Sequence, residues 1–235
     1  MSKKAEFPIN RLGHDNVTLL THPPRITVIK PHVIILLHGF NSLPGEKAKQ
    51  IAEFISENNL GHKFELIAPK LDPDPRKAVK EVNKLIRSNK KRRIHLIGTS
   101  LGGFYACYFR AKFKEEFLTV HAINPSWTPS KSLALHANQV LENFKSKILW
   151  EFKETYLLKF EEYERYIQEN LKTESSQNFY LHLSDDDEVL KFDIMLDFLN
   201  KHKIKYIKKV YHSDHRFRNV KEVMDHVVSV LSVKD

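Results

Sequence analysis

Short apolar runs of strand length alternate with longer amphipathic stretches over most of the chain. The runs are rich in β-branched and aromatic side chains and span residues 33–37, 64–68, 94–97, 118–123, 179–183 and 206–211. The stretches between them have helical periodicity, notably at residues 47–58, 76–88, 101–112, 189–201 and 220–231. Strands that alternate with helices form βαβ crossovers, which produce a mainly parallel sheet with helices on both faces. The chain is therefore predicted to have an α/β fold, and ligands bind such folds beyond the carboxyl ends of the strands.

Two segments depart from this alternation. Residues 1–30 contain three prolines and are expected to form an N-terminal extension with one or two added edge strands, whereas residues 31–235 are expected to form a single domain. Residues 126–177 form an insertion between two predicted strands. Its apolar residues recur at steps of three and four, the spacing of an amphipathic helix, at Phe152, Tyr156, Phe160, Tyr163, Ile167 and Leu171. Helices in this insertion would either form a cap over a ligand site or pack flat on the sheet.

The size and composition of the chain limit the protein classes that fit it. With 235 residues, 41% of them hydrophobic, the chain can bury one substantial core or at most two small ones. The strongest apolar run, at residues 33–37, is far shorter than the roughly 20 residues that cross a bilayer, and residues 1–15 show no apolar signal-peptide core. Cys107 is the only cysteine, which excludes an intramolecular disulfide and a multi-cysteine metal cluster. We expect a cytoplasmic protein without a membrane span, either a monomer or a homodimer.

The formal net charge of +9 is compatible with a nucleic acid, an acidic membrane surface or an anionic substrate as partner. The lysines, however, are spread along the whole chain, and no zinc-finger spacing or aromatic RNA-binding motif accompanies them. A dispersed basic charge of this kind is typical of a solvated surface. No nucleic-acid partner is therefore expected.

The segment Gly98-Thr99-Ser100-Leu101-Gly102 is a complete G-x-S-x-G motif between a predicted strand and a predicted helix. In this context the serine lies on a sharp strand-to-helix turn, and the glycines two residues on either side avoid side-chain clashes. The turn would expose the Ser100 hydroxyl near the positive end of the helix dipole. We therefore expect Ser100 to be a nucleophile, with Gly98 and Gly102 shaping the turn. An ordinary glycine-rich turn is the alternative.

The segment His38-Gly39-Phe40 directly follows the first strong strand. In hydrolases with a G-x-S-x-G turn, this position supplies one amide of the oxyanion hole, and the residue after the nucleophile supplies the other. The expected donors are therefore the backbone N–H groups of Phe40 and Leu101. Gly39 would let the loop pass close to the substrate, and His38 is expected to fix the loop rather than to act as a base.

A serine hydroxyl is a weak nucleophile, so a base and an orienting acid are needed. In proteins with this motif the acid and then the histidine follow the serine in the chain, each after a later strand. Candidate acids follow the strand at 179–183, and candidate bases follow the strand at 206–211: Asp185, Asp186, Asp187, Glu188, His212 and His215. Order and location agree with a triad, but the pattern leaves open which member of each cluster is used. Acidic clusters are also common in solvated loops, and no motif supports a role for His95, His121, His182 or His226.

Several segments resemble the bacterial YqiA-like esterases. They are residues 37–42 (LHGFNS), 68–71 (APKL), 98–106 (GTSLGGFYA), 123–125 (INP), 187–190 (DEVL) and 215–217 (HRF). That family consists of small α/β hydrolases associated with hydrolysis of acyl esters and acyl-CoA thioesters. The resemblance implies that Ser100 is the nucleophile, Asp187 the acid and His215 the base. The chain departs from the family pattern at Asp186, where a glycine is expected, and at 213–214, where a Gly-Asn pair is expected.

These features predict a serine hydrolase of the α/β-hydrolase fold that cleaves carboxylic esters or acyl thioesters through an acyl-enzyme. Its partner would be a small-molecule acyl ester or thioester, with acyl-CoA and acyl carrier protein as candidate carriers. The mechanism requires no metal and no organic cofactor. Activity is expected to rise with pH around neutrality as His215 loses its proton.

Some features of this prediction remain open at the level of sequence. If the insertion is a cap, Phe152, Tyr156 and Phe160 are expected to border an apolar acyl pocket; otherwise these rings anchor a helix in the core. An acyltransferase that uses the same acyl-enzyme is an alternative function. A noncatalytic binding protein with a hydrolase fold is another.

Overall fold

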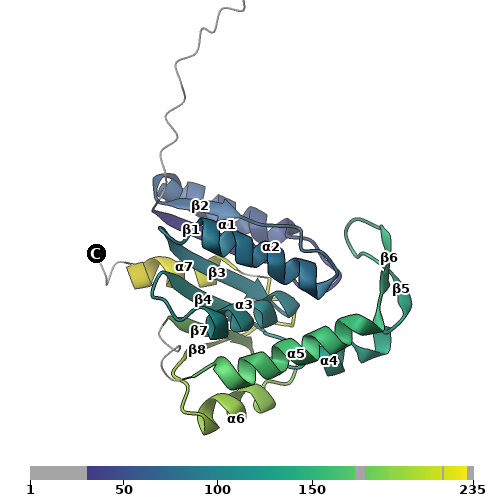
Figure 1. Ribbon diagram of the computed structural model, residues 1–235. Helices are drawn as coiled ribbons and strands as arrows, with labels where there is room; N and C mark the ends of the chain where they lie inside the picture. The colour runs from purple at the N-terminus through teal and green to yellow at the C-terminus, as the bar shows by residue number, and fades with distance from the viewer. Residues whose placement is uncertain (1–30, 173–177, 219, 232–235) are drawn as a thin grey trace, which may run out of the picture.

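A six-stranded parallel sheet forms the centre of the molecule. The computed structural model describes residues 31–172, 178–218 and 220–231 (Figure 1). The strands are β1 (His32–Leu37), β2 (Phe64–Ile67), β3 (Arg93–Thr99), β4 (Leu118–Ile123), β7 (Phe179–Ser184) and β8 (Ile207–Tyr211). They lie in the order β2-β1-β3-β4-β7-β8, and every neighbouring pair is parallel. The α/β prediction is confirmed, whereas the edge strands expected within residues 1–30 lie outside the described residues.

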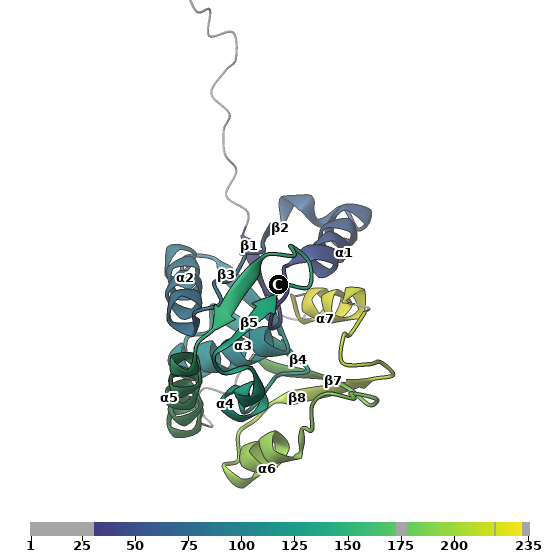
Figure 2. The ribbon, with the colours of Figure 1, turned by 90° about the vertical axis from the view of Figure 1, so that its right-hand side faces the viewer.

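Helices cover both faces of the sheet, which explains why residues 33–37 of β1 are apolar throughout rather than alternating. On β1, Ile34 and Leu36 pack against α1 (Gly45–Glu57) and α7 (Lys221–Leu231) on one face. The odd-numbered residues of β1 face α2 (Pro75–Ser88) and α3 (Leu101–Lys112) on the other face. The helix α6 (Asp193–Lys201) packs on the same face as α2 and α3 (Figure 2).

The helix α6 begins at Asp193, four residues later than the predicted start at 189. The reason is local. The backbone N–H groups of Val189 and Leu190 donate to the carboxylate of Asp187, at 2.9 and 2.7 Å, so this segment forms a turn around that side chain instead of a helical turn.

The insertion between β4 and β7 is only partly helical, which corrects the prediction. It contains α4 (Pro129–Ser132), a short 3-10 helix (Ala134–His136), an antiparallel hairpin of β5 (Gln139–Glu142) and β6 (Leu149–Phe152), and then α5 (Glu154–Asn170). Phe152 therefore ends a strand rather than beginning the amphipathic helix. The hairpin turn is stabilised by Asn143, whose side-chain oxygen accepts the N–H groups of Lys145 and Ser146 at 3.0 and 2.9 Å.

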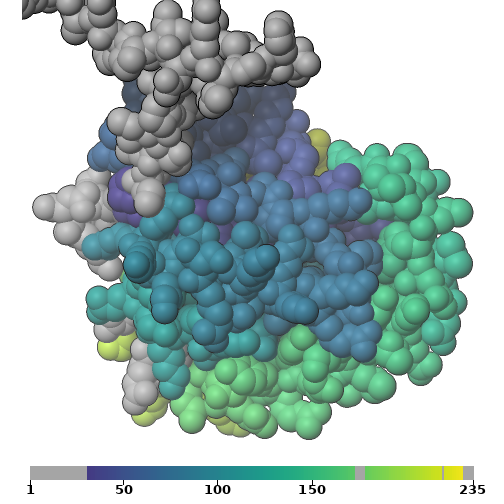
Figure 3. Space-filling model, turned by 45° about the horizontal axis from the view of Figure 1, so that its top comes forward, coloured from purple at the N-terminus to yellow at the C-terminus, as the bar shows by residue number. Residues whose placement is uncertain are grey.

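The two parts of the insertion have different positions. The aromatic residues of α5 pack on α3, with ring centroids 5.9 Å apart for Phe104 and Phe160 and 4.8 Å apart for Tyr108 and Tyr163. The hairpin instead projects past one end of the sheet (Figures 1 and 2). In the space-filling view the insertion forms a continuous green band along one side of the molecule (Figure 3). None of the helices among the described residues has the length and apolar character needed to cross a bilayer.

Candidate active site

Ser100 lies on a strained turn between β3 and α3. Its backbone has φ 54° and ψ −116°, a conformation that L-residues rarely adopt. The turn is closely packed: a Cβ atom on Gly98 would lie 2.1 Å from the carbonyl oxygen of Gly102, and a Cβ on Gly102 would lie 2.3 Å from that of Leu37. Only glycine fits at these two positions. The strain holds the Ser100 hydroxyl at the end of the strand, beside the first turn of α3.

A line of hydrogen bonds joins Ser100 to His215 and Asp187. The Nε2 atom of His215 lies 3.1 Å from the Ser100 Oγ, and its Nδ1 lies 2.8 Å from Oδ2 of Asp187. In the geometry this implies, Nδ1–H donates to the carboxylate and Nε2 accepts the proton of the hydroxyl. The Asp187 side chain is 2% exposed and that of His215 is 17% exposed. The three side chains come from the loops after β3, β7 and β8, so the parallel sheet brings them together at its carboxyl edge.

The surroundings of Asp187 distinguish it from the other acidic residues of its cluster. Its Oδ1 accepts the N–H groups of Val189 and Leu190, which leaves Oδ2 directed at His215. Asp185 instead pairs with the exposed His212, and this contact lowers the pKa of the Asp185 carboxyl. Of the two candidate histidines, His215 is therefore the one that faces Ser100.

Glu188 contributes to the same loop in a way the sequence did not indicate. Its carboxylate accepts the backbone N–H of His215 at 3.0 Å, and this hydrogen bond lowers the pKa of Glu188. The acidic cluster thus holds both the ring and the backbone of His215, through two neighbouring residues.

Asn124, at the end of β4, joins the loops that carry the acid and the histidine. Its Oδ1 accepts the N–H of Ser184 at 2.8 Å, and its Nδ2 donates to Ser184 Oγ at 2.8 Å and to the carbonyl oxygen of His215 at 3.3 Å. Ser184 in turn donates to the carbonyl oxygen of Asp214 at 2.8 Å. The side chain of Asn124 is fully buried. The sequence contained this residue within the INP segment but offered no motif that assigns it a position.

Two backbone N–H groups, those of Phe40 and Leu101, were expected to form an oxyanion hole beside Ser100. Among the described residues, neither the N–H of Phe40 nor that of Leu101 has a protein acceptor. Gly39 passes close to the serine, since a Cβ at this glycine would lie 3.4 Å from that of Ser100. His38 fixes this loop: its Nδ1 lies 2.9 Å from the carbonyl oxygen of Gly39, and its Nε2 accepts the N–H of Leu71 at 3.0 Å. Burial lowers the pKa of His38, in keeping with a neutral ring.

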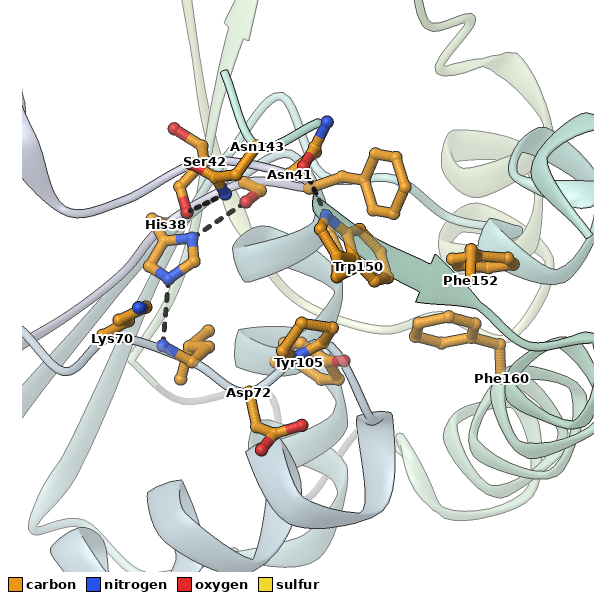
Figure 4. Close-up of a pocket in the computed structure, with 15 residues that line it drawn as sticks. His38, Asn41, Ser42, Lys70, Asp72, Tyr105, Asn143, Trp150, Phe152 and Phe160 are labelled. Atoms are coloured by element: carbon orange, nitrogen blue, oxygen red, sulfur yellow. Dashed lines mark hydrogen bonds between the residues drawn. The ribbon is translucent and has the colours of Figure 1, made fainter. Parts of the chain in front are cut away.

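A hollow of about 540 Å³, open to solvent, lies next to these amides (Figure 4). Five aromatic residues contribute to its walls, Phe40, Tyr105, Trp150, Phe152 and Phe160, and its polar lining includes Lys70 and Asp72. Of the three residues that were expected to border an acyl pocket, Phe152 and Phe160 line this hollow. Tyr156 does not line the hollow; its ring packs edge-on against Phe152, with centroids 5.7 Å apart.

The hairpin closes one side of this hollow because it is bonded to the loop after β1. Trp150 Nε1 donates to the side-chain oxygen of Asn41 at 2.9 Å, and Asn41 Nδ2 donates to the carbonyl oxygen of Glu142 at 2.8 Å. Asn41 adopts φ 51°, a left-handed conformation that asparagine tolerates well. The hairpin and the loop after β1 therefore form one wall.

The arrangement has the components of acyl-group chemistry. A hydroxyl lies within hydrogen-bond reach of a base, an acid orients that base, and two unpaired amides lie beside the hydroxyl. Such a site can attack a carbonyl carbon and stabilise the negative charge that forms on its oxygen.

Solved structures with a similar fold include several esterases and lipases. The structure reported for the metagenome-derived lipolytic enzymes LipS and LipT has a TM-score of 0.64 and 16% identity, covering 88% of this chain and 95% of that one. Est1E from Butyrivibrio proteoclasticus has a TM-score of 0.61 and 14% identity, covering 87% and 88%. A monoacylglycerol lipase from Paleococcus ferrophilus has a TM-score of 0.62 and 14% identity, covering 86% and 95%. These likenesses confirm the α/β-hydrolase fold.

One family model matches most of the chain. It covers residues 33–232, which include the sheet except for His32, the whole insertion and every residue of the candidate site. Its description is that of an uncharacterised protein family, and it agrees with the YqiA-like resemblance found in the sequence. The chain belongs to the family UPF0227.

Proposed function

We propose that the protein is a serine hydrolase that cleaves carboxylic esters or acyl thioesters through an acyl-enzyme. The observation that carries the proposal is the hydrogen-bonded line from Asp187 through His215 to Ser100. The esterases and lipases among the similar structures support it at the level of fold. The lone cysteine of the sequence supports a cytoplasmic location for this activity.

In the proposed reaction, His215 Nε2 takes the Ser100 proton as Oγ attacks the acyl carbon. The amides of Phe40 and Leu101 stabilise the resulting oxyanion, at about 3–4 kcal/mol for each donor. His215 then gives the proton to the leaving alkoxide or thiolate, and the acyl group remains as an ester on Ser100. Water, deprotonated by the same histidine, attacks this ester and releases the carboxylic acid.

The form of the hollow supports an acyl group as the part of the substrate that is bound. Aromatic rings at Phe40, Trp150, Phe152 and Phe160 line it, and so does Leu101, whose backbone N–H is the second proposed oxyanion donor. Ser100 and His215 are both partly exposed, which gives water access to the acyl-enzyme. This access favours hydrolysis over transfer to a second acceptor.

The test is hydrolysis of p-nitrophenyl esters from acetate to palmitate, beside a matching series of acyl-CoA thioesters. Ser100→Ala should lower kcat/KM by about 10³-fold or more, as loss of a triad nucleophile does. Ser88→Ala, which changes an exposed serine at the end of α2, is the matched control and should leave the rate unchanged. Transfer of the acyl group to added alcohols in place of water would indicate an acyltransferase.

A wild-type protein without activity on either series can still be classified with a fluorophosphonate probe. Labelling of Ser100 that Ser100→Ala abolishes would keep the nucleophile and direct the search to another acyl substrate. A folded wild-type protein that neither hydrolyses nor labels would contradict the proposal and favour a noncatalytic hydrolase fold.

A further inference from the structure

Three buried histidines from three different elements meet on the far side of the sheet from α3. His121 comes from β4, His182 from β7 and His226 from α7, and they are 0, 0 and 8% exposed. Their ring centroids form a nearly equilateral triangle, with separations of 5.4 Å, 5.6 Å and 6.0 Å. The proposed hydrolase mechanism uses none of these side chains.

The hydrogen bonds of the cluster leave ring nitrogens unpaired. His121 Nδ1 lies 3.1 Å from His182 Nε2, and His182 Nδ1 lies 2.8 Å from the hydroxyl of Tyr211. Within the described residues, the buried Nε2 of His121 and Nδ1 of His226 have no hydrogen-bond partner. Buried nitrogens without a partner destabilise a fold, and a nitrogen of a neutral imidazole that carries no proton has a lone pair that can bind a cation.

We propose that His121, His182 and His226 bind one divalent transition-metal cation of the zinc type. One ligand nitrogen from each ring lies within 4.8 Å of the others. Three imidazoles bound to one tetrahedral zinc, with Zn–N of about 2.0 Å, have their nitrogens about 3.3 Å apart and their ring centroids about 5.2 Å apart. The rings are therefore already close to the required triangle, and small side-chain rotations complete it.

The chemistry of the cluster fits zinc, nickel or copper rather than magnesium or calcium. All three ligands are imidazoles, which suit the former cations, whereas the latter take oxygen ligands. Burial lowers the pKa of all three rings, and that of His182 to about 3, so their lone pairs are available at neutral pH. With the proton of His182 on Nδ1, that N–H donates to the Tyr211 hydroxyl and fixes the ring with Nε2 free to bind the cation, as outer partners of metal-bound histidines do.

Some of the charged groups near the cluster oppose the binding of a cation and others favour it. Lys209 on β8 faces all three rings and opposes a cation. The negative charges of Glu222 and Asp225 on α7 raise the pKa of the neighbouring Tyr211, and these charges favour a bound cation. A bound cation would connect β4, β7 and α7. Two of its ligands, His121 and His182, lie two or three positions before Asn124 and Ser184, which hold the loops of the candidate active site. The effect of the cation would be to stabilise the fold, separate from the acyl chemistry.

The test is titration of the full chain, freed of metal with a chelator, with Zn²⁺ by calorimetry and with Co²⁺ by visible absorption. The wild type should bind one ion per chain, with a tetrahedral Co²⁺ spectrum and a higher Tm in Zn²⁺. His226→Gln should weaken binding by about 100-fold or more and Tyr211→Phe by about 10-fold, since loss of an outer partner alone costs 10–100-fold. His62→Gln, at an exposed histidine far from the cluster, should bind as the wild type does.

Two results would overturn the proposal: a wild type that binds neither ion at one per chain, or a His226→Gln variant that is folded by circular dichroism and binds as tightly as the wild type. Reduced binding in His62→Gln with normal binding in His226→Gln would place the ion at a surface site instead. None of these measurements depends on esterase activity.

Discussion

Asn124 shows how a single side chain can position a site it does not enter. It adopts φ 42° at the end of β4 and is buried without contact to solvent. From there its amide group reaches Ser184 on the acid side and the backbone of His215 on the base side. We interpret Asn124 as a positioning residue, which sets the distance between the two loops.

Asn124→Ala should therefore impair catalysis and stability together. The variant leaves the N–H of Ser184 and the carbonyl oxygen of His215 without this partner, which costs about 1–3 kcal/mol for each buried group left unpaired. We expect kcat to fall by about 10–100-fold with little change in KM, together with slower fluorophosphonate labelling of Ser100. Asn89→Ala, which removes one hydrogen bond to the carbonyl of Leu85 and one from Arg92 at the other end of the sheet, is the control. Unchanged labelling in a destabilised Asn124→Ala protein would show a purely structural role.

The residues of the site differ in how far the sequence alone could predict them. Ser100 was predictable because the elbow is a local structure, in which Gly98 and Gly102 are required within two residues. The choice of Asp187 over Asp185 depends on which carboxylate the turn at 189–190 surrounds, and the residue pattern left it open. Asn124 was missed because its partners lie 60 and 91 positions away along the chain.

At the scale of elements, the insertion combines both interpretations of its sequence. The helical periodicity correctly predicted α5, which packs on α3 in the core. The part of the insertion that borders the hollow as a cap would is mainly the β5–β6 hairpin. The hairpin was missed because the aromatic spacing that begins at Phe152 continues in register into the helix. The side chains of β6 fit both a strand pattern and a helix pattern. The hydrogen bonds between Asn41 and the hairpin, which orient the strand, connect positions about 100 residues apart.

Phe160→Ala and Tyr156→Ala should separate the pocket from the core. Both rings are buried, so each change should lower stability by about 3–5 kcal/mol, as for other large-to-small core changes. Phe160 lines the hollow and Tyr156 does not. Only Phe160→Ala should shift the preferred ester in the p-nitrophenyl series toward longer chains, and urea unfolding measures the common loss of stability. An equal shift in both variants would place the acyl chain elsewhere.

A row of buried histidines crosses the sheet, and it should make the fold sensitive to acid. Burial lowers the pKa of His95 and of His182 to about 3, whereas an unfolded histidine titrates near 6.5. Below about pH 6.5 the unfolded chain therefore binds protons that the folded chain does not, and the free energy of unfolding falls as the pH decreases toward 3. Above pH 6.5 these residues contribute no pH dependence. At pH 5 the loss is about 2 kcal/mol for each histidine.

Urea unfolding of His95→Leu at pH 7.5 and pH 5.0, with chelator present, tests this expectation. The stability lost between the two pH values should be about 2 kcal/mol smaller than in the wild type, because one titrating group is gone. His62→Leu, at an exposed histidine, should lose as much as the wild type. Equal losses in all three proteins would mean that His95 is protonated in the folded state.

At the scale of the whole molecule, the fold was largely predictable because a parallel sheet between two helical layers requires continuous apolar strands. Residues 33–37 meet this requirement fully, and residues 94–97 meet it apart from His95. The sheet order then brings the ends of β3, β7 and β8 to one edge, and this placed the predicted acid and base loops near Ser100. What the chain pattern could not supply was side-chain geometry across elements, as in the triangle of His121, His182 and His226.

The net charge of +9 gives a last prediction, which rests on the proposed function. Lys70 lies exposed on the rim of the hollow, where it would meet the phosphates of an acyl-CoA but nothing on a neutral ester. Exposed charges are screened within about 10 Å at 0.1 M salt, so the KM for acyl-CoA should rise with ionic strength while that for a p-nitrophenyl ester stays constant.

Lys70→Glu should raise the acyl-CoA KM by about 3–10-fold at low salt, an effect of about 1 kcal/mol. Lys90→Glu, in the turn before β3 at the opposite edge of the sheet, changes the net charge equally and should leave it unchanged. If both variants raise the KM alike, the overall charge of the molecule attracts the substrate; if only Lys70→Glu does, the phosphates lie at the rim of the hollow.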